Sequence, residues 1–134
     1  MHLTELVHWL DSTLNAEDVD DYGPNGLQIE ASEEVHKVAL GVTSNLRFIE
    51  SAIDWGADLA IVHHGVYWNG ASPTITGALG KRVRSLIENK VSLIGYHLPL
   101  DAHPTLGNAV SLATILGLSS VSYTHLTLPT IYSV

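Results

Sequence analysis

Three short apolar runs alternate with segments of helical periodicity, and this pattern limits the possible folds more than any other feature of the chain. The apolar runs are Val38–Val42, Leu59–Val62 and Val91–Ile94, and the helical segments between them span residues 44–56 and 76–88. Short apolar runs of this kind are typical of strands, and strands that alternate with helices pair in parallel through right-handed crossovers. We therefore expect an α/β fold with a mainly parallel sheet flanked by helices.

Further elements are expected around this unit. Apolar residues recur at helical spacing over residues 3–15 and again over 108–116, and residues 27–29 favour a short strand. Ser44 is the expected N-cap of the helix that follows the first apolar run, and Gly56 is its expected stop. That first run is apolar throughout, as in strands of sheets that are covered on both faces, so we expect this strand to be covered on both faces.

Composition limits the kinds of partner. The chain has 134 residues, 46% of them hydrophobic, which fits one domain with a core. Its net charge is −8 with only six Lys and Arg residues, which argues against binding to nucleic acid or to anionic membranes. Cysteine is absent, so disulfides, iron–sulfur clusters and thiolate zinc sites are excluded. The start lacks the pattern of a signal peptide, and no apolar run approaches the roughly 20 residues of a membrane span, so we expect a cytoplasmic protein.

Histidines follow two of the expected strands. His63 and His64 come directly after the run that ends at Val62, and a second cluster, from His97 through Asp101 to His103, follows the run that ends at Ile94. Neutral histidine is the commonest protein ligand for transition metals, and ligands in open α/β sheets bind at the carboxyl ends of the strands. Successive side chains of a strand point to opposite faces, so adjacent histidines suit two ions better than one. The pattern predicts a dinuclear metal site. The alternative is that His63 and His64 are ordinary polar residues of a surface loop.

The loop before the first expected strand is acidic and rich in turn residues. We interpret the carboxylates from Glu17 to Asp21 as a solvated face. Asn25 fits a turn that requires positive φ, and the alternative is that its amide approaches the metals.

The last fourteen residues depart from the pattern of the rest. Val121–Thr130 resembles the translation of a transposon-based sequencing adapter, and the alternative is a genuine β-hairpin or tail. We therefore expect an α/β domain over residues 1–120 and a non-native tail over residues 121–134. On this interpretation the chain is the amino-terminal fragment of a longer gene product.

Three motifs in order resemble one known family. They are Asp21–Gln28, Val62–Gly65 and His97–Pro104, with Gly107 and Asn108 after them. Together they resemble the NIF-three-like dinuclear-metal-centre hexameric proteins, also called GTP cyclohydrolase I type 2 homologues, from the first helix to about Gly117. The resemblance implies the amino-terminal half of a larger α/β fold, two divalent ions per subunit (Zn, Fe, Mn, Co or Ni) and a ring-shaped homohexamer.

The resemblance also implies roles for individual residues. His64 and Asp101 would ligate one ion and His63 the other, while the family completes the site with a histidine and a bridging glutamate from a second α/β half. The chain stops before that half, so we expect at most one weakly held ion here. His97 is expected to be a hydrogen-bonding neighbour of the ligands or an acid or base, and the alternative is a strand-end histidine bonded to backbone.

Two bound cations that activate a bridging water would perform hydrolysis. The leading hypothesis is a metal-dependent hydrolase of nucleotide-like small molecules, with a GTP cyclohydrolase reaction as the family name suggests. The alternative class is a non-catalytic metal-binding scaffold or metallochaperone. For this chain alone, a third interpretation is an inactive fragment.

Overall fold

The computed structural model describes residues 1–118, so the predictions about the tail concern residues outside the described part. In chain order the elements are α1 (Leu3–Leu14), the 3-10 helix η1 (Ala16–Asp18), β1 (Gly26–Ile29), β2 (Val38–Thr43), α2 (Leu46–Trp55), β3 (Leu59–His64), α3 (Gly77–Glu88), β4 (Ser92–Gly95), α4 (Leu98–Ala102) and α5 (Asn108–Ile115). The predicted strands and the long helices are all present, with boundaries shifted by one or two residues. Helix α4 was not predicted, because five residues are too few to show a helical period.

The strands form one sheet in the order β1-β4-β3-β2. β2 pairs in parallel with β3, and β3 pairs in parallel with β4, as the alternation of strands and helices predicted. β1 pairs antiparallel with β4 and closes the other edge of the sheet. The mainly parallel α/β fold is therefore confirmed, and the carboxyl ends of β3 and β4 lie side by side.

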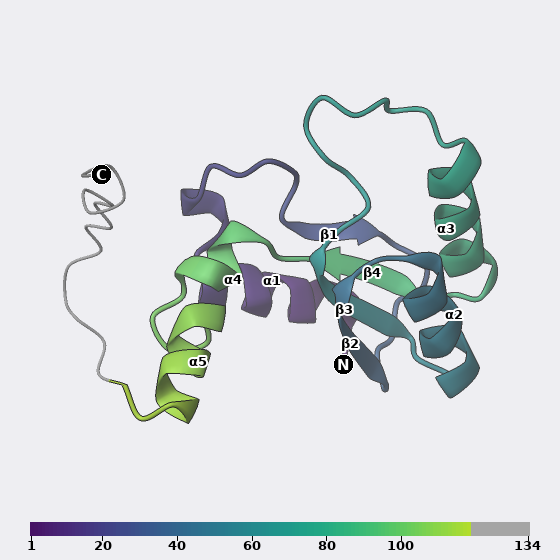
Figure 1. The fold of residues 1–134 in the computed structure, drawn as a ribbon. Coiled ribbons are helices and arrows are strands. Elements are labelled where there is room, and N and C mark those ends of the chain that lie inside the picture. Colours follow the sequence, from purple (N-terminus) through teal and green to yellow (C-terminus); the bar gives the residue numbers. More distant parts are fainter. Residues whose placement is uncertain (119–134) are drawn as a thin grey trace.

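Helices cover both faces of the sheet (Figure 1). α2 and α3 pack on one face and α1 on the other, so the sheet separates two apolar cores. The core under α2 and α3 contains Ile49, Ala60, Val62, Val83, Leu86 and Leu93, among others. The core under α1 contains Leu3, Leu14, Leu59, Ile94 and Tyr96, among others. α4 and α5 lie beyond the carboxyl end of the sheet (Figure 1).

The expectation that the first apolar run is covered on both faces was wrong. β2 is an edge strand, and its side chains Leu40 and Val42 are 76% and 67% exposed. The core under α1 reaches Ile61 of β3 and Val38 at the start of β2, and within residues 1–118 the rest of that face of β2 stays open. Apolar sequence alone did not distinguish an edge strand from a central one.

The predicted N-cap of α2 was also displaced by one residue. The Asn45 side chain accepts a hydrogen bond from the Phe48 N–H at 2.9 Å and caps the helix. Ser44 is fully buried, and its N–H continues the strand pairing by donating to the His64 carbonyl at 3.0 Å. The extended backbone therefore runs one residue further than predicted. Gly56 ends the helix with φ 76°, as expected.

Within residues 1–118, none of the helices has the length and hydropathy that crossing a bilayer requires.

Candidate metal centre

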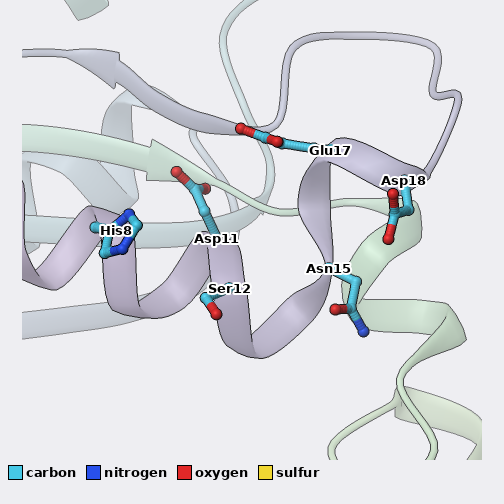
Figure 2. A pocket seen from close by; sticks show the side chains of 6 residues that line it. All are labelled: His8, Asp11, Ser12, Asn15, Glu17 and Asp18. Atoms are coloured by element: carbon cyan, nitrogen blue, oxygen red, sulfur yellow. The ribbon is translucent and has the colours of Figure 1, made fainter.

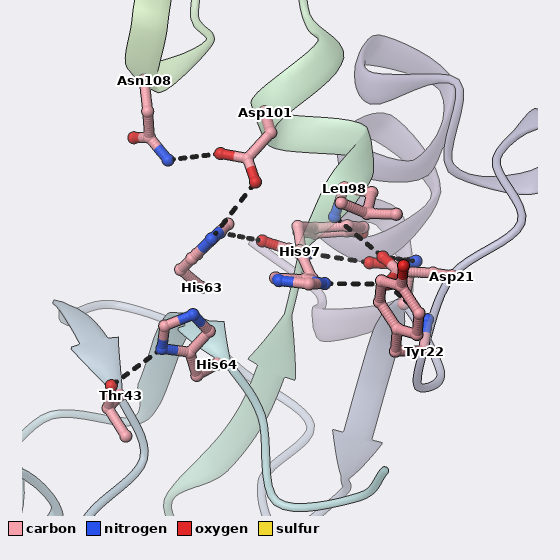
Figure 3. Close-up of polar contacts among 11 residues, drawn as sticks. Asp21, Tyr22, Thr43, His63, His64, His97, Leu98, Asp101 and Asn108 are labelled. Atoms are coloured by element: carbon pink, nitrogen blue, oxygen red, sulfur yellow. Dashed lines mark hydrogen bonds and ion pairs between the residues drawn. The ribbon is translucent and has the colours of Figure 1, made fainter. Parts of the chain in front are cut away.

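Four predicted site residues meet at the carboxyl ends of two neighbouring strands (Figure 3). His63 and His64 are the last two residues of β3, His97 precedes α4, and Asp101 lies on α4. Parallel pairing of β3 with β4 places these strand ends together, although the two motifs are more than 30 residues apart in the sequence. The short helix α4 then turns Asp101 back towards His63.

The three imidazoles form a compact cluster. The ring centroids lie 4.6 Å apart for His63 and His64, 4.8 Å for His63 and His97, and 5.6 Å for His64 and His97. One ring nitrogen from each residue can be chosen so that all three lie within 4.8 Å of one another. The adjacent histidines therefore stay close together at the strand end, although side chains along a strand alternate between its two faces. This spacing is compatible with ligands of one ion or of two neighbouring ions.

Each imidazole of the cluster is anchored through its Nδ1 atom. The Nδ1 atom of His63 lies 3.1 Å from the Tyr96 carbonyl oxygen, and that of His64 lies 3.0 Å from the Thr43 hydroxyl. The Nδ1 atom of His97 lies 2.7 Å from Asp21 Oδ1. Metal-binding histidines characteristically use one ring nitrogen for such an anchor and the other for the ion. The anchors leave Nε2 of every ring available.

Asp101 supplies a carboxylate to the cluster. Its Oδ2 atom lies 3.4 Å from His63 Nε2, and its Oδ1 atom accepts a hydrogen bond from Asn108 Nδ2 at 2.6 Å. The resemblance grouped Asp101 with His64, whereas the closest contact here is with His63. Which ligands share an ion stays a prediction.

The electrostatics of the cluster favour neutral imidazole at His64. Burial, with the neighbouring His63 and His97, lowers the pKa of His64 below its ordinary value of 6.5, and the Asp101 carboxylate acts in the opposite direction. A neutral imidazole keeps the lone pair that a metal ion requires.

The interpretation of Asp21 as part of a solvated face was wrong. The Asp21 side chain is 2% exposed. Burial by itself would raise the pKa of this carboxyl, but hydrogen bonds from His97, Asn25 and the backbone N–H groups of Leu98 and Tyr22 lower it from 3.8 to about 2. The run of acidic residues gave no sign that Asp21 is buried while its neighbours are not. The signal in the sequence was the place of Asp21 in the motif Asp21–Gln28.

Asn25 serves the site through hydrogen bonds instead of an unusual backbone conformation. Its Oδ1 atom accepts the His97 N–H at 2.8 Å, and its Nδ2 atom donates to Asp21 Oδ2 at 2.9 Å. Positive φ occurs at the next residue, Gly26, where it is 93°. His103 lies outside the cluster, because its ring nitrogen accepts the N–H groups of Thr105 and Leu106 in its own loop.

A separate cleft opens beside α1 and η1 (Figure 2). It is lined by His8, Asp11, Ser12, Asn15, Glu17 and Asp18. The Asp11 carboxylate accepts the hydroxyl of the buried Tyr96 at 2.6 Å and therefore has a structural partner. The predicted donors His63 and His64, with His97 beside them, lie elsewhere, at the end of the sheet, and we place the candidate metal centre there.

Curated relatives are nearly half identical to this chain over the residues that match. It is 46% identical over 119 residues to the GTP cyclohydrolase 1 type 2 homolog of Escherichia coli (strain K12), covering 89% of this chain and 48% of that protein. It is 43% identical over 115 residues to the protein of the same name from Pseudomonas aeruginosa, covering 86% and 46%. The chain thus spans about half the length of these relatives.

Solved structures agree with the sequence comparison. The fold matches protein ybgI, described as of unknown function, with a TM-score of 0.88 and 45% identity over 90% of this chain and 49% of that one. It matches TTHA1606 from Thermus thermophilus with a TM-score of 0.86 and 38% identity over 90% and 50%. The family model Duf34/NIF3 (NGG1p interacting factor 3) matches residues 1–128. This chain therefore belongs to the Duf34/NIF3 family.

Proposed function

We propose that His63, His64, His97 and Asp101 form part of a divalent-metal centre, and that proteins of this family's full length use that centre to hydrolyse nucleotide-like small molecules. Because the chain spans about half the length of its relatives, the hydrolytic activity and its substrate class are proposed for the full-length proteins. The ring-shaped hexamer implied by the resemblance also stays a prediction.

One observation carries the proposal: three imidazoles converge, each anchored through Nδ1, so that no anchor uses an Nε2 atom and His63 Nε2 faces the Asp101 carboxylate. Imidazole and carboxylate donors suit Zn, Fe, Mn, Co and Ni, and these residues therefore fit such an ion. Asp101 brings one negative charge, which does not balance two dications. We accordingly expect the described residues to hold at most one ion, with water at the remaining positions and weak affinity.

A bound divalent ion would supply Lewis-acid polarisation and a water of lowered pKa. The protein's own residues orient the donors and cover them. Thr43 and the Tyr96 carbonyl hold two of the rings, and Trp68 lies edge-on to His97 with 5.2 Å between ring centroids. Trp68 thereby shields one side of the cluster from solvent. The name of the curated relatives, GTP cyclohydrolase 1 type 2 homolog, supports a nucleotide as the substrate class.

Metal binding is tested by calorimetric titration of the 134-residue chain with zinc. We expect one ion per chain, an affinity that falls as the pH drops through the ordinary histidine pKa of about 6.5, and a large loss in His64→Ala. His103→Ala is the matched control, because this histidine bonds only within its own loop. Equal binding by wild type and His64→Ala, or two tight sites per chain, would contradict the proposal.

Hydrolysis is tested with a panel of purine and pyrimidine nucleotides that includes GTP. The assay compares this chain with the full-length Escherichia coli relative, each with and without added zinc or manganese. Metal-dependent turnover by the relative supports the hydrolase. If the relative binds metal and converts none of the panel, the hydrolase is refuted and the metal-binding scaffold takes its place.

A further inference from the structure

The buried carboxylate of Asp21 is surrounded by hydrogen-bond donors (Figure 3). Its Oδ1 atom receives the Tyr22 N–H at 2.6 Å and lies 2.7 Å from His97 Nδ1. Its Oδ2 atom receives the Leu98 N–H at 2.8 Å and lies 2.9 Å from Asn25 Nδ2. A side chain that is 2% exposed thus has four protein partners.

The positions of the protons in this network follow from its fixed members. The backbone N–H groups of Tyr22 and Leu98 can only donate. The Asn25 amide is oriented by the His97 N–H, which must donate to Asn25 Oδ1, so Asn25 Nδ2 must donate to Asp21. Asp21 is therefore an acceptor on both oxygens, and a carboxylate in that role requires a proton on His97 Nδ1.

We propose that Asp21 is a positioning residue of the metal centre: it holds the proton of His97 on Nδ1 and directs the Nε2 lone pair towards His63 and His64. This inference rests on the proposed function, and it places His97 beside the ligands His63 and His64 as a hydrogen-bonding neighbour with an unprotonated Nε2. Figure 3 shows the second ring nitrogen of His97 on the side of His63 and His64.

His97 differs from the other two rings in the charge of its anchor. His63 is held by a backbone carbonyl and His64 by a hydroxyl, both neutral. A carboxylate anchor forms a stronger, charge-assisted hydrogen bond and increases the basicity of the ring towards a metal ion. Of the three rings, His97 is therefore the one with the most firmly fixed tautomer.

The same carboxylate also holds the segment that carries Asp101. Asp21 and Asn25 accept the successive backbone N–H groups of Leu98 and His97, at the start of α4. Asp101 lies in the first turn of that helix. One loop residue thus positions a histidine directly and the carboxylate ligand through the helix start.

The proton position is tested by two-dimensional ¹H–¹⁵N NMR of the histidine rings in the 134-residue chain, with chelator present and the pH above the histidine pKa. We expect His97 to show a protonated Nδ1 and an unprotonated Nε2 in the wild type, and a mixture of tautomers in Asp21→Ala. Asp20→Ala removes an exposed carboxylate from the same loop and should leave the tautomer unchanged. A wild-type His97 with its proton on Nε2 would overturn the inference without any variant.

Zinc affinity tests the metal role of the same contact. Asp21 holds His97 beside the ligands and the helix start that carries Asp101. We therefore expect Asp21→Ala to bind zinc roughly 10–100-fold more weakly than the wild type, the range found when the groups that support a metal site are removed, and Asp20→Ala to bind like the wild type. Equal affinity of Asp21→Ala and the wild type would overturn the inference and leave the proposed function standing. A wild type that binds no zinc would refute the proposed function, while the NMR result would still decide whether Asp21 fixes the His97 tautomer.

Discussion

Replacing Asp21 by asparagine keeps the shape of the side chain, removes its charge and turns one acceptor oxygen into an N–H donor that faces other donors. The pH-dependent part of its effect measures what the ionised carboxylate contributes to folding. Four hydrogen bonds lower the pKa of this carboxyl from 3.8 to about 2 although burial opposes the shift. The side chain is 2% exposed, so solvent screens it little. A pKa lowered by that amount corresponds to about 2 kcal/mol of stability in favour of the ionised form. We expect Asp21→Asn to lose at least that much free energy of unfolding at neutral pH.

The sign of the pH dependence follows from the direction of the shift. Because the folded-state pKa is depressed, the contribution is present above the ordinary pKa of 3.8 and is lost as the pH falls through about 2. The difference in stability between the wild type and Asp21→Asn should therefore shrink by about 2 kcal/mol between about pH 4 and about pH 2. Taking the difference removes the contributions that other titrating groups make to both proteins.

Urea denaturation followed by circular dichroism, with chelator present and at several pH values, measures this difference. Asp20→Asn is the control, because its exposed carboxylate should change stability little. A loss in Asp21→Asn that is the same at neutral pH and at about pH 2 would refute the reasoning, since it would come from packing and not from the charge.

Three further tests, two of them with a matched control substitution, examine the fold around the site. Tyr96→Phe removes a buried hydroxyl that donates to a carboxylate at 2.6 Å, and we expect a loss of about 1.5–3 kcal/mol in urea denaturation; an unchanged midpoint would show that this hydrogen bond contributes nothing. Leu93→Ala in the fully buried part of β4 should lower the free energy of unfolding by about 2–5 kcal/mol. Leu40→Ala on the exposed face of β2 should change it little, and equal losses in the two variants would contradict the edge position of β2. Asn45→Ala should lower the free energy of unfolding by about 1 kcal/mol in thermal denaturation, because it removes the side-chain cap of α2. Thr76→Ala should cost less, because Thr76 makes no side-chain hydrogen bond at the N-cap of α3. A larger loss in Thr76→Ala than in Asn45→Ala would show that Asn45 does not cap α2.

The local sequence contained enough information for the order of the elements and for the meeting of the histidine motifs. Strands β3 and β4 are short apolar runs with helical segments between them, so parallel pairing followed from the pattern. Since His63, His64 and His97 all stand where such strands end, parallel pairing alone brings them to one edge. Their clustering could therefore be predicted before any coordinate was known.

Other features depended on contacts between distant segments. Asp20 and Asp21 are chemically identical neighbours, but only Asp21 packs against the start of α4, more than 70 residues away, and only it becomes a buried anchor. Leu40 and Val42 resemble core residues in sequence, but they lie on the edge strand and stay exposed. The hydrophobic period of a segment records which of its faces is apolar, because that depends on residues close in sequence. Which partner covers that face, and which carboxylate loses its water, depends on residues that only the folded chain brings together.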